Sequence, residues 1–142
     1  MTAKRELKVL VSGLQFGEGP RWRNDRLWYS DFYAHMVRTV DLKGVVRDVV
    51  EVPNQPSGLG FDPQGRLLIV SMLDRLLLRL EEDGSLTTVG DLSGVVAAPC
   101  NDMVVDAEGR AYVGNFGFER HKGEDPATTS MWRVDPDGSI HE

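Results

Sequence analysis

Residues 56–71 have the sequence PSGLGFDPQGRLLIVS, and this stretch decides the fold. In its first part, Leu59 and Phe61 alternate with small or polar residues, as in a half-buried strand. The run 62–65, DPQG, has the composition of a tight turn, with proline second and glycine fourth. Residues 67–70 are apolar and favour a strand. The stretch therefore predicts two short strands joined by a tight turn.

The same unit recurs along the chain. The arginine that follows the turn is Arg26, Arg66 or Arg110, and these positions are 40 and 44 residues apart. A second series of turns marks the other end of each unit, at residues 41–44, 82–85 and 137–139. Self-similarity at about 40–45 residues, with several short strands in each unit, is typical of propeller blades. The sequence thus predicts an all-β fold, and specifically a β-propeller.

The expected blades cover residues 14–53, 54–94 and 97–142, so that residues 1–142 form one partial propeller of about three four-stranded blades. A further strand is expected at 7–12, where it would be a candidate for completing a last blade absent from this sequence. The outermost strand of the third blade is expected to be absent or barely begun, because few residues follow its final turn.

An arc of three blades is incomplete, because propellers typically close with about 4–8 blades. We expect this chain to be the first half of a longer propeller, or a half that pairs with another copy. In either case the arc leaves two open edges, and unpaired backbone groups there would favour self-association.

Composition and charge limit the kinds of molecule that this chain is expected to bind. Hydrophobic residues make up 41% of the chain and charged residues 27%, as in an ordinary soluble globular protein. The net charge of −6 argues against nucleic acid and anionic membrane as partners, and it is compatible with a bound cation. The single cysteine, Cys100, excludes an internal disulfide and a cysteine-based metal cluster. The polar start lacks the pattern of a signal peptide, so a cytoplasmic location is expected.

Glu18 is the strongest candidate for a functional residue. It lies between Gly17 and Gly19, at the start of a strand that should line the central channel. Asn101 has the related position in the third blade. Calcium prefers carboxylate and carbonyl oxygens in sets of about 6–8, so both side chains are candidate metal ligands. The alternative is that they hydrogen-bond backbone groups at the strand starts, as buried polar groups must.

Two further polar residues follow predicted second strands. Asn115 is a candidate substrate-binding residue, with a turn-forming role as the alternative. Asp31 has a similar place in the first blade and could face the channel mouth. After Asn115 comes an insertion, residues 116–129, that would either shape a binding mouth or form a mobile surface loop.

Three motifs in order give the chain a family resemblance. They are GEGPRW at 17–22, PSGLGFD at 56–62 and NDMVVDAEGR at 101–110. Together they resemble the family of senescence marker protein, gluconolactonase and luciferin-regenerating enzyme. The resemblance implies a six-bladed propeller of about twice this length. It also implies a calcium-dependent lactone hydrolase that holds Ca²⁺, or another divalent cation, in the channel mouth.

The resemblance also assigns roles to residues. Glu18 matches the family's first metal-binding glutamate, and Asn101 matches an asparagine at the metal and substrate site. Two other ligands, an asparagine and an aspartate, come from later blades, and the aspartate is the favoured general base. No catalytic residue is therefore expected in this chain. Some members have a substrate-contacting arginine where this sequence has Pro99, so that contact does not carry over.

Two functions stay open at this point. The first is a metal-dependent hydrolase in which water attacks a polarised carbonyl of a small lactone or related ester. The second is a non-catalytic propeller fragment or binding module. Residues 1–142 would supply Glu18 and Asn101 to the first of these, far fewer ligands than calcium takes.

Overall fold

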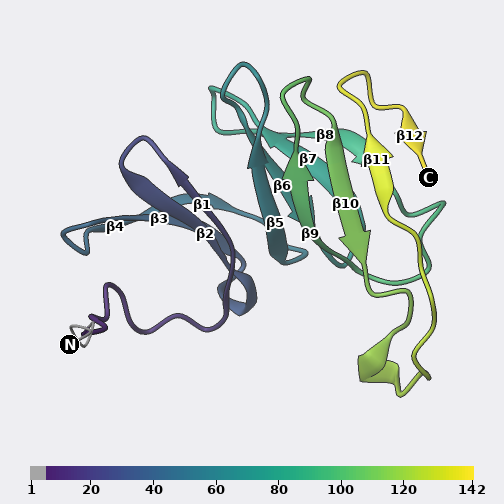
Figure 1. Ribbon diagram of the computed structural model, residues 1–142, viewed down its shortest axis with the longest axis horizontal. Coiled ribbons are helices and arrows are strands. Elements are labelled where there is room, and N and C mark those ends of the chain that lie inside the picture. Colours follow the sequence, from purple (N-terminus) through teal and green to yellow (C-terminus); the bar gives the residue numbers. More distant parts are fainter. Residues whose placement is uncertain (1–5) are drawn as a thin grey trace, which may run out of the picture.

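The computed structural model describes residues 6–142, which form three four-stranded antiparallel sheets (Figure 1). The first blade consists of β1 (Gly17–Arg23), β2 (Arg26–Asp31), β3 (Met36–Asp41) and β4 (Val46–Glu51). The second consists of β5 (Pro56–Phe61), β6 (Leu67–Ser71), β7 (Leu76–Leu80) and β8 (Leu86–Asp91). The third consists of β9 (Cys100–Val105), β10 (Ala111–Asn115), β11 (Trp132–Val134) and β12 (Ile140–His141). The short 3-10 helices η1 (Phe32–Ala34) and η2 (Arg120–Lys122) lie in the loops after β2 and β10.

In each blade the strands are paired in chain order. The inner strands β1, β5 and β9 lie side by side in three different sheets, with β5 in the middle (Figure 1). The predicted all-β propeller of three four-stranded blades is confirmed, and its ring is incomplete. The last strand, β12, has two residues, so of the two predicted alternatives it has barely begun rather than being absent.

The repeated turns explain why the sequence folds into blades. In the second blade, Asp62 Oδ1 accepts the Arg66 backbone N–H at 2.8 Å, and Asp62 Oδ2 accepts Arg66 Nε at 2.7 Å. Asp106 and Arg110 repeat both bonds in the third blade, at 3.0 and 2.6 Å. In these two turns the glycine before the arginine has a φ of +83° or +82°, which glycine adopts without strain. The second and third units therefore close their first hairpins through local contacts.

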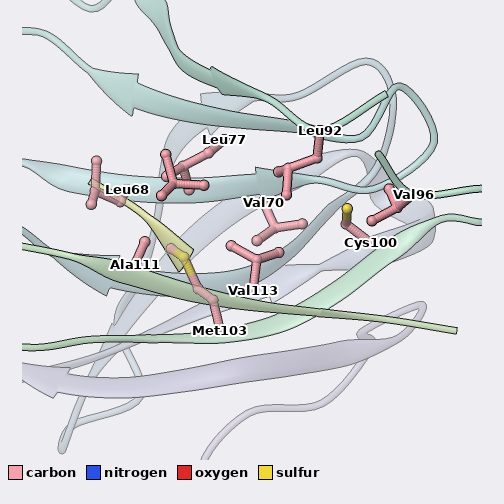
Figure 2. Packing of buried hydrophobic residues seen from close by; sticks show 10 residues of the cluster. Leu68, Val70, Leu77, Leu92, Val96, Cys100, Met103, Ala111 and Val113 are labelled. Carbon is pink, nitrogen blue, oxygen red and sulfur yellow. The ribbon is translucent and has the colours of Figure 1, made fainter. Parts of the chain in front are cut away.

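Neighbouring blades pack face to face through apolar side chains. One cluster, between the first two blades, contains Val37, Leu59 and Ile69. Another, between the second and third blades, contains Val70, Cys100 and Met103 (Figure 2). Each fully buried aliphatic side chain of this kind stabilises the fold by about 1.5–3 kcal/mol relative to exposure. The two ends of the arc therefore present sheet faces, which corrects the expectation that they present open strand edges.

The strand predicted at 7–12 is not formed. Residues 6–14 are irregular, and the Leu7 and Val9 side chains are 97% and 77% exposed. A strand is stabilised by a hydrogen-bonded neighbour, and each sheet of the described chain already has its four strands without this segment. Among residues 6–142, no helix has the length and apolar character needed to cross a bilayer.

Candidate metal and substrate site

Three polar side chains occupy the same place in the three inner strands. Glu18, Ser57 and Asn101 are the second residues of β1, β5 and β9. Ser57 Oγ lies 2.9 Å from Glu18 Oε1 and 2.9 Å from Asn101 Oδ1. The structure thus brings together the two predicted metal ligands, which lie in blades that do not adjoin, through a serine of the blade between them.

The strand pairing is irregular at or just after this position in each inner strand. The register of β1 against β2 shifts between Glu18 and Arg21, and that of β5 against β6 shifts between Pro56 and Leu59. The pairing of β9 with β10 is irregular at the matching point, before Met103. Bulges bend a strand locally and re-aim its side chains. They explain how all three second residues turn toward one point at the inner ends of the blades.

Two glycines let the inner strands approach closely enough for this contact. A Cβ atom on Gly19, whose φ is +60°, would lie 2.6 Å from the Ser57 carbonyl oxygen. A Cβ atom on Gly58 would lie 2.5 Å from the Met103 backbone nitrogen. Both distances are far too short for a side chain, and the obstacle is backbone. The glycines that follow Glu18 and Ser57 are therefore required by the spacing of the blades.

The cluster of Glu18, Ser57 and Asn101 has more acceptors than protons. A serine hydroxyl carries one proton, so Ser57 can donate to only one of the two facing oxygens. Ser57 is buried, and its carbonyl accepts the Ser30 hydroxyl at 2.7 Å, which fixes the backbone there. Whichever oxygen does not receive this proton, Glu18 Oε1 or Asn101 Oδ1, still lies 2.9 Å from Ser57 Oγ. This second contact requires a further proton, a cation, or a rotation of the Asn101 amide that turns its NH₂ group toward Ser57.

Electrostatics favour a positive charge at this point. Burial raises the pKa of the Glu18 carboxyl above its usual range, the Ser57 hydrogen bond opposes this, and the nearby Asp102 charge adds to it. A carboxyl that has lost part of its hydration gains from a proton or a cation beside it. Carboxylate, amide and hydroxyl oxygens are all hard donors, the type that calcium takes.

The described residues fit a divalent cation in part. Glu18, Ser57 and Asn101 offer one oxygen group from each blade, against the 6–8 oxygens of a complete calcium shell. Within residues 6–142, no three His, Cys, Asp or Glu side chains gather where they could hold a metal ion. The three side chains thus offer fewer donors than a complete calcium shell needs.

Asn115 has a different setting from that of Asn101. Its Nδ2 donates to the Ser130 carbonyl at 3.0 Å, and its Oδ1 accepts the Gly117 backbone N–H at 3.0 Å and the Thr129 hydroxyl at 2.6 Å. These bonds close the base of the long loop after β10, in agreement with the turn-forming alternative. Substrate binding by Asn115 stays a prediction.

Asp31 does not face the channel mouth. Its carboxylate is fully buried, accepts the backbone N–H groups of Gln15 and Phe16 at 2.9 and 3.0 Å, and forms an ion pair with Arg38. These contacts anchor the segment that leads into β1. Its role is therefore structural.

Sequence reasoning missed two residues at this site. Ser57 could have been found by aligning residues 56–58 with 17–19 and 100–102, which puts it level with Glu18 and Asn101. The other is Arg21, whose guanidinium reaches across β5 to the Asp102 carboxylate and the Met103 carbonyl. The sequence offers no comparable way to recognise Arg21, because Asp102 and Met103 lie more than 80 residues away from it.

The fold and the site together define a class, a propeller with hard oxygen donors where its inner strands begin. The family model described as SMP-30/Gluconolactonase/LRE-like region matches residues 16–142 of this chain. The chain belongs to that family, as the resemblance of its three motifs implied. No curated protein matches the sequence.

Solved structures agree with this assignment. A gluconolactonase from Xanthomonas campestris is 26% identical with a TM-score of 0.73, over 92% of this chain and 48% of that one. A calcium-binding regucalcin from Agrobacterium tumefaciens is 22% identical with a TM-score of 0.73, over 94% of this chain and 44% of that one. A luciferin-regenerating enzyme is 18% identical with the same TM-score, over 93% and 46%. The last two show the fold alone, and the chain spans about half the length of all three.

Proposed function

We propose that Glu18, Ser57 and Asn101 are this chain's part of the divalent-cation site of a gluconolactonase-like lactonase. The observation that carries the proposal is the convergence of the three side chains, with Ser57 Oγ 2.9 Å from an oxygen of each neighbour. The family match and the 26% identity to a gluconolactonase support it. The proposed cation is Ca²⁺ or another divalent ion, and the proposed substrate is a small lactone or related ester.

Each of the three residues would have a separate role in binding the cation. Glu18 supplies the charge that holds the cation, and Asn101 supplies a neutral oxygen. Ser57 fixes the direction of both side chains through its hydroxyl. When bound, a divalent cation polarises the lactone carbonyl and stabilises the oxyanion that develops on it. The general base would come from outside this chain, as the family resemblance implies, so residues 1–142 alone are expected to hydrolyse lactones poorly.

A non-catalytic propeller fragment or binding module remains the second candidate. The observation in its favour is the absence, within residues 6–142, of any group of three potential His, Cys, Asp or Glu ligands. A site with so few charged donors would bind calcium weakly. The two candidates differ in whether Glu18 matters for cation-dependent hydrolysis.

Calorimetry with CaCl₂ at low micromolar protein and a gluconolactone hydrolysis assay test the proposal. We expect weak calcium binding that Glu18→Gln reduces at least tenfold, and slow hydrolysis that depends on the ion and on Glu18. The matched control is Glu82→Gln, which removes an exposed carboxylate on the β7–β8 turn and should change neither. Calcium binding that survives Glu18→Gln would contradict the site. Micromolar affinity with brisk turnover would show that the chain needs no further ligands.

A further inference from the structure

The two outer faces of the arc carry apolar side chains that nothing in residues 6–142 covers. Trp22, on the face of the first blade, is 54% exposed. Val104 and Met131, on the third blade, are 59% and 62% exposed. A shallow hollow on the third blade is lined by Asp102, Met103, Val104, Tyr112 and Met131.

The internal repeat indicates which residues of a neighbouring blade these two faces would pack against. Trp22 lies four residues after Glu18, just as Phe61 and Val105 lie four residues after Ser57 and Asn101. Phe61 packs edge-on against Trp28 of the blade before it, with ring centroids 5.3 Å apart.

The contact between the second and third blades shows which position faces Val105. A Cβ atom on Gly60 would lie 2.4 Å from Val105 Cγ2. Gly60 is the residue that corresponds to Val104 in the repeat. By this correspondence, Trp22 is a blade-contact residue that no blade of residues 6–142 covers, and its expected neighbour is a position like Val104.

We propose that two copies of this chain close one ring about a two-fold axis, each placing its first blade on the third blade of the other. Trp22 of one copy then fills the hollow beside Val104 of the other, in two identical contacts. A second copy fits because the chain spans 48% of the gluconolactonase that it resembles in fold, so that two arcs supply six blades. Closed two-fold assemblies are also the commonest form of homo-oligomer.

The contact would be wider than those within the chain. Asp102 and Val104 stand where the second blade has Gly58 and Gly60, so the incoming strand cannot approach β9 as closely as β9 approaches β5. An aromatic side chain in a hollow is a frequent anchor of such interfaces. Trp22 has the size to bridge the wider gap.

The ring would also complete the cation site, and this step rests on the proposed function. Each copy contributes Glu18, Ser57 and Asn101, which gives six oxygen-bearing side chains and enters the range that calcium takes. Two Glu18 carboxylates that face one channel repel each other without a cation between them. Since the ion binds the closed ring better than the single arc, calcium should promote dimerisation.

Sedimentation velocity across a protein concentration series, in CaCl₂ and in EDTA, tests the association. We expect a dimer in CaCl₂ and at least tenfold weaker association in EDTA. Trp22→Glu and Val104→Glu should each abolish the dimer, because both place a charge in the contact. Leu73→Glu is the matched control, since Leu73 is exposed on the second blade, which already has both neighbours, and it should dimerise normally. A monomer at every concentration in CaCl₂ would overturn the proposal.

Disulfide cross-linking tests the arrangement. The double variant Trp22→Cys, Val104→Cys should form a covalent dimer under mild oxidation, whereas each single variant should not. Single variants that cross-link as well as the double one would indicate that like faces meet, which contradicts the ring. Circular dichroism confirms that each variant is folded.

The failure of this proposal can be told from the failure of the proposed function. A chain that binds calcium through Glu18 but stays monomeric overturns the ring and leaves the site intact. The opposite outcome is a dimer that cross-links as expected but whose association constant changes neither with CaCl₂ nor in Glu18→Gln. That outcome supports the ring and overturns its link to the cation site.

Discussion

The Ser57 hydroxyl lies 2.9 Å from Glu18 Oε1 and joins two blades through side chains that are 39 residues apart in the chain. The contact exists only because adjacent inner strands nearly touch. The blade packing and the candidate site are therefore one structural feature.

Replacing Ser57 by alanine should weaken cation binding more than it weakens the fold. The variant loses the hydroxyl that orients Glu18 and Asn101, and loss of such an orienting group typically reduces metal affinity by about 10–100-fold. The stability loss should be about 1 kcal/mol, the usual worth of a hydrogen bond. Calcium calorimetry and urea unfolding measure the two effects. Ser12→Ala, at an exposed serine before β1, is the control. Unchanged calcium affinity in Ser57→Ala would argue against an orienting role.

Gly58→Ala should destabilise the protein by about 1–3 kcal/mol, as overpacking does. The new methyl group would lie 2.5 Å from the Met103 nitrogen and would force β5 and β9 apart. Gly94→Ala is the matched control, because a Cβ atom there meets nothing within 4 Å and the φ of Gly94 is ordinary. Urea unfolding should show a clear loss for the first variant and almost none for the second. Equal midpoints would mean that the blades can separate freely.

The fold could be predicted from the sequence because its signals are local. The turn at Asp62 uses its own side chain to hold Arg66 four residues on, and a glycine supplies the positive φ. Contacts of this kind can be recognised from the sequence of the turn alone, without knowing how the rest of the chain folds. The period of the turns then reveals the blades. That Glu18 and Asn101 share one candidate site could be predicted because they occupy equivalent positions in the repeat and match family motifs, and their role as metal ligands stays a prediction.

The missed features depend on contacts between distant segments. An alternating pattern at 7–12 favours a strand, but a strand needs a partner, and Leu7 remains exposed. Asp31 follows a strand end like a channel residue, yet Arg38 and the backbone of residues 15–16 surround it. The sequence shows which residues are polar, and the packing decides which of them meet.

Asp31→Asn should destabilise the protein by about 1.5–3 kcal/mol, the usual worth of a hydrogen bond to a charged group. The amide keeps the shape of the carboxylate but loses the charge that faces Arg38 in a fully buried position. Asp48→Asn is the control, since Asp48 contacts the same arginine but its side chain is 63% exposed. Exposed pairs contribute about 0–1 kcal/mol. Thermal unfolding should separate the two variants, and equal losses would contradict a special role for Asp31.

Cys100 should be an unreactive thiol in the folded protein. It is fully buried between the second and third blades, and this burial raises its pKa to about 11, with the Arg75 charge opposing the shift and Asp74 adding to it (Figure 2). The thiolate is the reactive form, so iodoacetamide should modify the native protein far more slowly than the protein in urea. Native and unfolded rates that agree would contradict this burial.

The same pKa shift predicts a loss of stability at alkaline pH. Between pH 9.0, the ordinary value for this thiol, and about 11, the unfolded chain releases a proton that the folded chain retains. The unfolded state therefore binds fewer protons there, and the free energy of unfolding falls as pH rises. Cys100→Ala lacks this titration, so its stability should decline less over that range. Parallel urea-unfolding curves for the two proteins from pH 8 to 11 would show that Cys100 does not control the alkaline loss.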